Sequence, residues 1–538
     1  MKTAFISFIA FTLLTSWSSA GIADYETEVF VPGSGMHGIH GLTFDSEDRL
    51  FVGSVVGQSI YEVRPDNGQH RTYIGAPGGM ADDLEFGPDG TLYWTSVILG
   101  EIHAQKNQGP MRVIATGLPG INSIAFKQDG RLFATQVFQG DALHEIDPLG
   151  VKPPRKIIEN MGGLNGFDFG PDGLLYGPLW FKGEVVKVDV DSGEMTTVAT
   201  GFKIPAAVNF DSKGILWVLD TAKGHIVSID PETGKKTVYV GHPTGMDNLA
   251  FDSNDELYFT VMTDNAVYHF DRETRESTPI RQSLLSVPGD LAIYADGDQE
   301  TLYLADLFAI RSIDAETAEV RDMGRFPADN IEYPNGVAVG ERFVHFSSWF
   351  TGTIQTVDRK THEILKTYHD LPTAFDVVEL DDGSLLALQM FTGTITRLTG
   401  TGADEREIVA RGLTTPVSMV RSGPDSVYVT LFAKGQIVRV DLKTGEHTVV
   451  AEGLSGPEGL DLAPDGRIIV AETGIRSVSA IDPNTGEREV LAKDLPIGYQ
   501  MPAGMPPMGG VTGIAVAQDG TIFVSSDIED AIYTIRAR

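Results

Sequence analysis

The segment PAAVNFDSKGILWVLDTAKGHIVSIDPETG, residues 205–234, contains three short β-type runs separated by turns. The first run closes at Phe210, the second (LWVLD) alternates apolar and polar residues, and the third ends in Ile-Asp. At the same turn elsewhere the chain carries Asp-Gly, as at Asp172-Gly173, and glycine supplies the positive φ that a tight hairpin turn needs. The segment therefore predicts antiparallel strands joined by short turns.

This unit repeats along the whole chain of 538 residues. Six phenylalanines that close the first run follow one another at separations of 42, 40, 43, 41 and 41 residues: Phe44, Phe86, Phe126, Phe169, Phe210 and Phe251. The second half continues the pattern around Ile293, Val339, Leu380, Val420, Leu462 and Val516. A fourth run, rich in Thr and Val, completes each unit. Four short strands in about forty residues are typical of a β-propeller blade.

Twelve units are too many for one ring, so the sequence predicts an all-β protein of two tandem six-bladed β-propellers with four-stranded blades. We expect the first propeller in residues 24–275 and the second in residues 276–538. The last unit stops after its third strand. The runs YETEVFV (25–31) and STPIRQSLL (277–285) precede the two rings, and we expect each to complete the last blade of the ring that it leads.

The N-terminus, MKTAFISFIAFTLLTSWSSA (residues 1–20), has a lysine, a short apolar run and a small-residue ending. This pattern is typical of a cleaved secretory signal, which predicts a periplasmic or secreted protein. No other stretch is apolar and long enough to span a membrane. The chain contains no cysteine, which excludes thiolate chemistry. Its formal charge of −33 argues against nucleic acid as a partner. We expect a small-molecule substrate.

One position in each unit, eight residues before the turn glycine, often carries a polar side chain. The first strand of a propeller blade lines the central channel, so six such positions form a ring at the channel mouth. In the first propeller this ring contains His40, Asp82, Asn122, Asn165, Ala206 and Asp247. In the second it contains Gly289 with Asp290 beside it, Asn335, Phe375 or Asp376, Val417, Glu458 and Thr512. The spacing from Gly383 selects Phe375, whereas strand alternation selects Asp376.

Oxygen ligands from Asp, Glu and Asn suit calcium, magnesium or manganese, and an added His admits zinc. Such a cation polarises a carbonyl and activates water. Alternatively, polar channel residues bind only water, and Asp or Asn before Gly forms turns. Five polar residues out of six in the first ring favour a site. The tryptophans are expected to pack between blades: Trp94, Trp180, Trp217 and Trp349.

The quoted segment and its counterpart GPEGLDLAPDGRIIVAETGIRSVSAIDPNTGE (456–487) resemble the gluconolactonase and senescence-marker-protein family. More broadly they resemble the propeller superfamily that includes strictosidine synthase and virginiamycin B lyase. In the lactonases, a Glu, an Asn and an Asp hold one divalent cation, with the Asn three blades after the Glu and the Asp four blades after it. This order implies Glu458, Asn335 and Asp376, provided that Asp376 faces the channel, where it would also be the catalytic base.

The first ring departs further from the lactonase pattern, because His40-Gly41-Leu42 stands where the family has Glu-Gly-Pro and Ala206 replaces an Asp. Its residues Asp247, Asn122 and Asn165 nevertheless keep the angular arrangement, with His40 and Asp82 alongside. It is therefore a second candidate ring.

Three functions remain open on the sequence. The leading hypothesis is an exported, metal-dependent hydrolase of a lactone or related ester. The first alternative is a lyase that opens a cyclic ester by elimination, as virginiamycin B lyase does, with a base such as His40. The second is a propeller that binds a ligand or protein without catalysis, because fold alone does not decide function.

Overall fold

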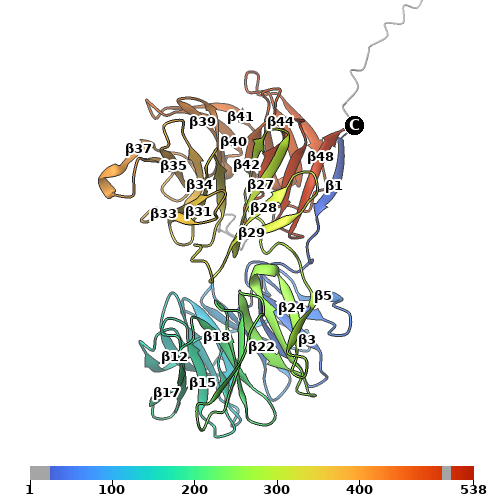
Figure 1. The fold of residues 1–538 in the computed structure, drawn as a ribbon, viewed down its shortest axis with the longest axis vertical. Helices are drawn as coiled ribbons and strands as arrows, with labels where there is room; N and C mark the ends of the chain where they lie inside the picture. Colours follow the sequence, from blue (N-terminus) through green and yellow to red (C-terminus); the bar gives the residue numbers. More distant parts are fainter. Residues whose placement is uncertain (1–24, 500–509) are drawn as a thin grey trace, which may run out of the picture.

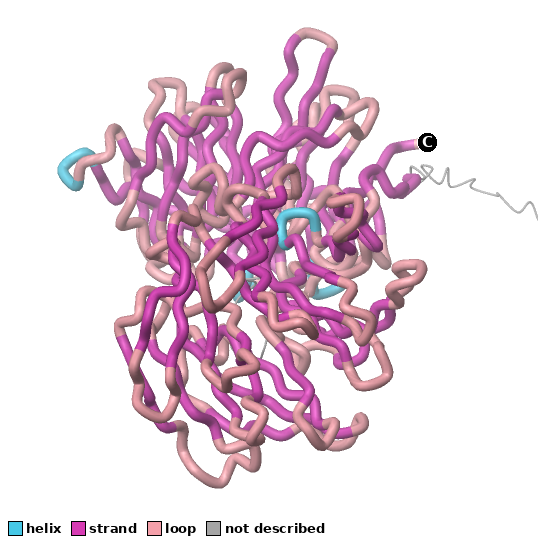
Figure 2. The backbone as a smooth tube through the Cα atoms, turned by 60° about the horizontal axis from the view of Figure 1, so that its bottom comes forward, coloured by secondary structure: helices cyan, strands magenta, loops and turns pink. Residues whose placement is uncertain are grey.

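A computed structural model describes residues 25–499 and 510–538, and the predicted signal segment 1–20 lies outside these ranges. Within the described residues the strands form twelve four-stranded antiparallel sheets, and the helical elements are short 3-10 turns. Figure 1 shows two bodies, the first blue to green and the second yellow to red. The tube in Figure 2 is dominated by strands and loops. The predicted fold class, two tandem six-bladed propellers, is confirmed.

The first propeller contains six sheets whose strands follow chain order. They are β2 (Ile39–Phe44), β3 (Leu50–Ser54), β4 (Ser59–Val63) and β5 (His70–Ile74); β6 (Leu84–Phe86), β7 (Thr91–Ser96), β8 (Glu101–Lys106) and β9 (Arg112–Ala115); β10 (Ile121–Phe126), β11 (Leu132–Gln136), β12 (Ala142–Ile146) and β13 (Arg155–Glu159); β14 (Asp168–Phe169), β15 (Leu175–Leu179), β16 (Glu184–Val188) and β17 (Met195–Thr200); β18 (Pro205–Phe210), β19 (Leu216–Asp220), β20 (His225–Ile229) and β21 (Lys236–Tyr239); β22 (Met246–Phe251), β23 (Leu257–Val261), β24 (Ala266–Asp271) and β25 (Glu276–Arg281).

The second propeller contains the other six sheets. They are β26 (Leu291–Asp296), β27 (Gln299–Asp306), β28 (Ala309–Asp314) and β29 (Val320–Arg325); β30 (Gly336–Val339), β31 (Phe343–Ser348), β32 (Thr353–Asp358) and β33 (Ile364–Tyr368); β34 (Ala374–Glu379), β35 (Leu385–Gln389), β36 (Thr394–Leu398) and β37 (Arg406–Ala410); β38 (Pro416–Gly423), β39 (Ser426–Leu431), β40 (Gln436–Asp441) and β41 (His447–Glu452); β42 (Pro457–Leu462), β43 (Ile468–Glu472), β44 (Ser477–Ile481) and β45 (Arg488–Ala492); and β46 (Ile514–Val516), β47 (Ile522–Ser526), β48 (Ala531–Ala537) and β1 (Tyr25–Val31). The 3-10 turns are η1 (Met262–Asp264), η2 (Ala403–Glu405), η3 (Phe432–Lys434) and η4 (Thr473–Ile475).

Each ring closes through its innermost strands. Neighbouring inner strands contact one another from β2 round to β22, and β22 contacts β2. In the second ring the same contacts run from β26 to β46 and back to β26. Apolar clusters fill the spaces between successive sheets, for example one that joins β34, β35, β38 and β39. The contacts between inner strands and the apolar clusters between sheets together close each ring, as in a propeller.

The predicted use of the two leading strands is wrong. The strand β25 pairs with β24 and completes its own sheet, so the first propeller extends beyond the predicted boundary at residue 275. The strand β1 pairs antiparallel with β48 and completes the last sheet of the second propeller (Figure 1). The last sheet therefore takes its fourth strand from the N-terminal part of the chain. The chain therefore crosses twice between the propellers.

Turn chemistry accounts for the regular blades. Gly173 has φ of 77°, and its N–H donates to Gly170 O at 2.9 Å, while Asp172 accepts the N–H of Leu174 at 3.1 Å. Asp-Gly thus sets the hairpin, as the sequence predicts.

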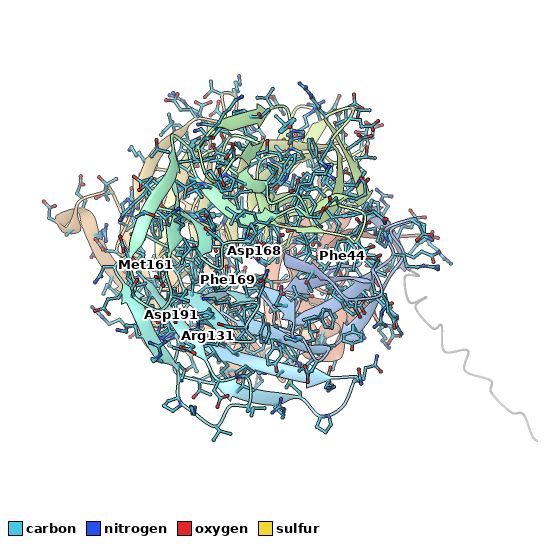
Figure 3. The ribbon with its side chains drawn as sticks, turned by 90° about the horizontal axis from the view of Figure 1, so that it is seen from below. Phe44, Arg131, Met161, Asp168, Phe169 and Asp191 are labelled. Atoms are coloured by element: carbon cyan, nitrogen blue, oxygen red, sulfur yellow. The ribbon has the colours of Figure 1, made fainter. Side chains whose placement is uncertain are left out.

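An ion pair also joins two neighbouring blades. Arg131 pairs with Asp191 at 2.7 Å, and Figure 3 labels both residues on the first propeller.

The two propellers are joined by buried polar contacts. Arg325, at the end of β29, binds both carboxylate oxygens of Asp264 in η1 of the first propeller, each at 2.7 Å. Asn265 donates to Asp530 of the second propeller at 2.6 Å, and Asp530 also binds His37. Paired charge-assisted bonds of this kind fix orientation as well as distance. No helix of the described residues combines the length and the apolar character needed to cross a bilayer.

Candidate functional site

A cavity of about 160 Å³ lies where the first ring faces the second propeller. Five of the six ring positions of the first propeller line it: His40, Asp82, Asn122, Asn165 and Asp247. The second propeller supplies other lining residues: Leu307, Phe308, Phe326, Tyr333, Trp349 and Phe350. The structure therefore brings the second candidate ring together and covers it with aromatic side chains that the sequence did not predict for the site.

The centre of the polar group is His40, which lies on β2. Its Nδ1 lies 3.1 Å from Oδ2 of Asp247 on β22 and 3.9 Å from Oδ1 of Asp82. The strands β2 and β22 are the neighbours that close the ring, so closure itself brings His40 to Asp247. Because Asp247 holds Nδ1, Nε2 is the ring nitrogen left for proton transfer.

The environment of His40 favours its charged form. Burial disfavours the imidazolium, but the hydrogen bond to Asp247 and the charges of Asp247 and Asp82 outweigh burial and raise the pKa of His40 above 6.5. Burial raises the pKa of Asp82 as well; His40 opposes this change, and the nearby charge of Asp247 adds to it. A His and a carboxyl group with pKa values shifted by one another are typical of proton-transfer sites.

Amide oxygens lie beside these groups. The hydroxyl of Ser123 donates to Oδ1 of Asn122 at 2.9 Å and lies 3.4 Å from Oδ1 of Asn165. Asn122 also forms a hydrogen bond with Asp82. Asn122 lies on β10 and Asn165 lies in the segment that leads into β14, so the ring geometry brings two neighbouring blades to one polar group.

The wall opposite this polar group is apolar and aromatic. The ring of Phe308 meets His40 edge to face with centroids 5.4 Å apart, and Phe326 lies 4.6 Å from Tyr333. Trp180 of the first propeller stacks on Phe326 at 6.3 Å. Trp180 and Trp349, which were predicted to pack between blades, both line the cavity, a role that the sequence did not predict. Both residues lie in loops between strands, on the side that faces the other propeller. The repeat pattern of the sequence does not indicate which loops face another domain.

The second ring has a different character. Phe375, Val417 and Val511 pack in one apolar cluster with Met390, and Trp349 and Phe432 lie against it. Val417 was predicted as a channel position, so this cluster favours Phe375 as the channel residue of its strand. The alternative on which the lactonase order depends, that Asp376 faces the channel, stays a prediction.

Asp376 instead links two blades. Its two carboxylate oxygens accept the backbone N–H of Val377 at 2.7 Å and of Met419 on the next blade at 2.6 Å. Four other aspartates bridge neighbouring blades: Asp83, Asp168, Asp290 and Asp461. Figure 3 labels one of them, Asp168. A contact that recurs in five blades is structural, so Asp376 has a structural role, and its catalytic role stays a prediction.

Glu458 and Asn335 are also engaged. Glu458 accepts hydrogen bonds from Thr473 at 3.0 Å and from the backbone N–H of Thr512 at 2.8 Å, and Asn335 donates to Phe375 O at 3.0 Å. Burial raises the pKa of Glu458, and Asp527 raises it further. All three members of the predicted cation set, Glu458, Asn335 and Asp376, thus make hydrogen bonds within the protein, and cation binding by this set stays a prediction.

The first ring offers donors of the types that divalent cations use. In residues 25–499 and 510–538, however, no group of three or more His, Asp or Glu side chains is arranged to hold a metal ion. His40 Nδ1 lies between the two carboxylates instead. The divalent cation, predicted as calcium, magnesium, manganese or zinc, thus stays a prediction.

Comparison with protein-family models gives no match, and comparison with curated proteins gives none. Among solved structures, virginiamycin B lyase from Staphylococcus aureus is similar at 15% identity and a TM-score of 0.39, over 52% of this chain and 96% of that chain. A gluconolactonase from Xanthomonas campestris is similar at 15% identity and a TM-score of 0.37, over 44% of this chain and 86% of that chain. Similarity at this level assigns no activity to this chain.

Proposed function

We propose that the cavity over the first ring is the active site of an enzyme that opens a cyclic ester, with His40 as the proton-accepting group. The observation that carries the proposal is the set Asp247–His40–Asp82 at the polar end of a largely apolar cavity. A carboxylate on Nδ1 orients the imidazole and increases the basicity of Nε2. The N-terminal segment supports the further proposal that the protein is exported.

Elimination fits this site because it needs a base and no covalent intermediate with the protein. Nε2 of His40 accepts the proton from the carbon next to a carbonyl. The electron pair of that C–H bond becomes a C=C bond, and the bond between the neighbouring carbon and the ester oxygen breaks with its electron pair on the leaving carboxylate. Asp247 stabilises the imidazolium that forms, because it is a negative charge held 3.1 Å from Nδ1.

Hydrolysis in the same cavity is the second candidate. The convergence of the Asn122 and Asn165 amide oxygens on Ser123 favours it, since these oxygens and the carboxylates of Asp82 and Asp247 are the ligand types of a divalent cation. A divalent cation, when bound, supplies polarisation of the ester carbonyl and lowers the pKa of water. His40 would then hold the proton of the attacking water.

The lining indicates the class of substrate. Aromatic residues surround the opening, and two of them remain accessible, Phe138 at 44% and Phe350 at 47%. Exposed aromatic side chains around a concave site bind apolar groups, since their burial against a ligand is favourable. We therefore propose a cyclic ester that carries an aromatic or other bulky apolar group.

The test is product analysis in oxygen-18 water with three probes: quinupristin as a cyclic depsipeptide, dihydrocoumarin as an aromatic lactone and glucono-δ-lactone as a sugar lactone. Elimination leaves the product with the mass of the substrate and a new double bond, whereas hydrolysis adds labelled water. We expect His40→Gln to lower the rate at least about 100-fold, and His269→Gln, a control on the outer strand β24, to leave it unchanged. Full activity of His40→Gln, or no opening of any probe, contradicts the proposal.

A further inference from the structure

Tyr333 belongs to the second propeller but lies at the polar group of the first. It precedes β30 and lines the same cavity as His40, Asp82 and Asp247. Its ring is 4.6 Å from Phe326 and 5.1 Å from Phe350, and Phe308 lies between it and His40, 6.0 Å from Tyr333 and 5.4 Å from His40. These rings hold the phenol over the first ring.

The backbone at Tyr333 is unusual. Its φ is +49°, and two other bulky residues of the cavity wall, Phe138 at +67° and Leu307 at +38°, share the left-handed region. This region is unfavourable for large side chains and persists where the surrounding structure enforces it, often at functional sites. Three such residues from separate loops lie around one cavity.

The loop that carries Tyr333 is tied to the first propeller. Arg325, just before it, binds Asp264 through two hydrogen bonds and donates to Thr244 O at 3.0 Å. Further along the loop, Ala328 O accepts a hydrogen bond from Lys203 of the first propeller at 2.9 Å. All four bonds cross the junction between the propellers, so the position of Tyr333 relative to His40 does not depend on packing alone.

The hydroxyl of Tyr333 is available to a ligand. Among the described residues it makes no hydrogen bond, and it lines the cavity together with Asp247 and Asp82. A phenol has an ordinary pKa of about 10, so it carries its proton at neutral pH. The hydroxyl of Tyr333 can therefore donate a hydrogen bond to an acceptor in the cavity.

We propose that Tyr333 is a catalytic residue supplied by the second propeller, which donates a hydrogen bond to the carbonyl oxygen of the substrate as negative charge develops there. The role rests on the proposed function and is common to both of its reactions. In elimination the proton leaves the carbon next to the carbonyl and the oxygen gains enolate charge; in hydrolysis it gains charge when water attacks. In each case Tyr333 keeps its proton and stabilises the oxygen electrostatically.

The experiment compares Tyr333→Phe with the wild-type protein. The variant keeps the ring contacts with Phe308, Phe326 and Phe350 and loses only the hydroxyl. Tyr303→Phe, a control on β27 of the same propeller and outside the cavity, removes a hydroxyl elsewhere. With the probe that the wild type opens, we expect kcat to fall about 100- to 1,000-fold, KM to change less than about threefold, and the pH midpoint set by His40 to remain. An unchanged kcat in Tyr333→Phe overturns this inference. The proposed function is tested separately by His40→Gln, so the two failures are distinguishable.

Binding separates the two proposals when no probe is opened. Calorimetry with a cyclic phosphonate analogue of dihydrocoumarin, whose charged oxygen stands in for the developing oxyanion, measures the hydrogen bond without turnover. About 100-fold weaker binding to Tyr333→Phe, with unchanged binding to Tyr303→Phe, supports the donor role even where the ester-opening proposal fails. Equal affinity of Tyr333→Phe and wild type, or no binding to either, overturns it.

Discussion

The imidazole of His40 and the phenyl ring of Phe308 meet edge to face, with centroids 5.4 Å apart and planes at 78°. His40 belongs to the first propeller and Phe308 to the loop between β27 and β28 of the second. This contact places the polar ring of one propeller directly under an aromatic wall of the other. The candidate site is thus built from two propellers, whereas the sequence analysis placed the leading candidate within the second ring alone.

The pH dependence of kcat/KM should report the pair His40–Asp247. The base is neutral imidazole, so activity rises as pH rises through the raised pKa of His40. In Asp247→Asn the hydrogen bond to a charge and the charge itself are lost, which lowers the pKa of His40. The acidic limb should therefore move to lower pH, with a reduced maximum. Rates measured between pH 5 and 9 check this, and Glu273→Gln, on an exposed turn of the same sheet, should keep the wild-type profile.

Substrate selection should depend on Phe350. This side chain is 47% exposed and lines the cavity, so its loss removes ligand contacts with little effect on folding. We expect Phe350→Ala to raise KM for quinupristin or dihydrocoumarin about tenfold, the effect of losing roughly 1.4 kcal/mol of apolar contact, and to leave glucono-δ-lactone unaffected. The control is Phe391→Ala, 63% exposed on the same propeller and outside the cavity. Equal effects of the two variants on KM would contradict the proposal that Phe350 contacts the substrate.

Elemental mass spectrometry tests the cation. The protein is incubated with calcium, magnesium, manganese and zinc and then desalted. We expect a bound equivalent to be lost in Asp82→Asn and kept in Glu458→Gln, because Asp82 lines the open cavity whereas both oxygens of Glu458 accept protein hydrogen bonds. Loss only in Glu458→Gln would restore the second ring as the metal site. If the wild-type protein binds none of these metals, the cation is no longer part of the proposed function.

Asp376 should matter for stability and not for turnover. In Asp376→Ala two buried backbone N–H groups, of Val377 and Met419, lose their acceptor. Each costs about 1–3 kcal/mol when left unsatisfied. Urea unfolding should show a loss of several kcal/mol at unchanged kcat for correctly folded protein, and Asp381→Ala, an exposed control in the next turn, should stay within about 0.5 kcal/mol. A stable but inactive Asp376→Ala would support Asp376 as a catalytic group.

The repeat in the sequence was sufficient for the fold. Spacing of the six phenylalanines, Asp-Gly turns and strand alternation predicted twelve four-stranded sheets in two rings, since each of these signals acts within one blade. The first-ring residues were also predictable, because a fixed distance from the turn glycine corresponds to a fixed depth in the channel. His40, Asp82 and Asp247 were found in this way.

Contacts between distant segments decided the rest. Whether β1 or β25 completes a given sheet depends on which edge is open after folding, and both strands have the same local pattern. The orientation of Phe375 and Asp376 depends on a shift in strand register between Ala374 and Asp376, which alternation alone does not show. Tyr333 and Phe308 reach His40 only because Arg325 and Asp264 fix one propeller against the other. Local spacing determined the blades and the polar ring, and tertiary packing decided what covers that ring.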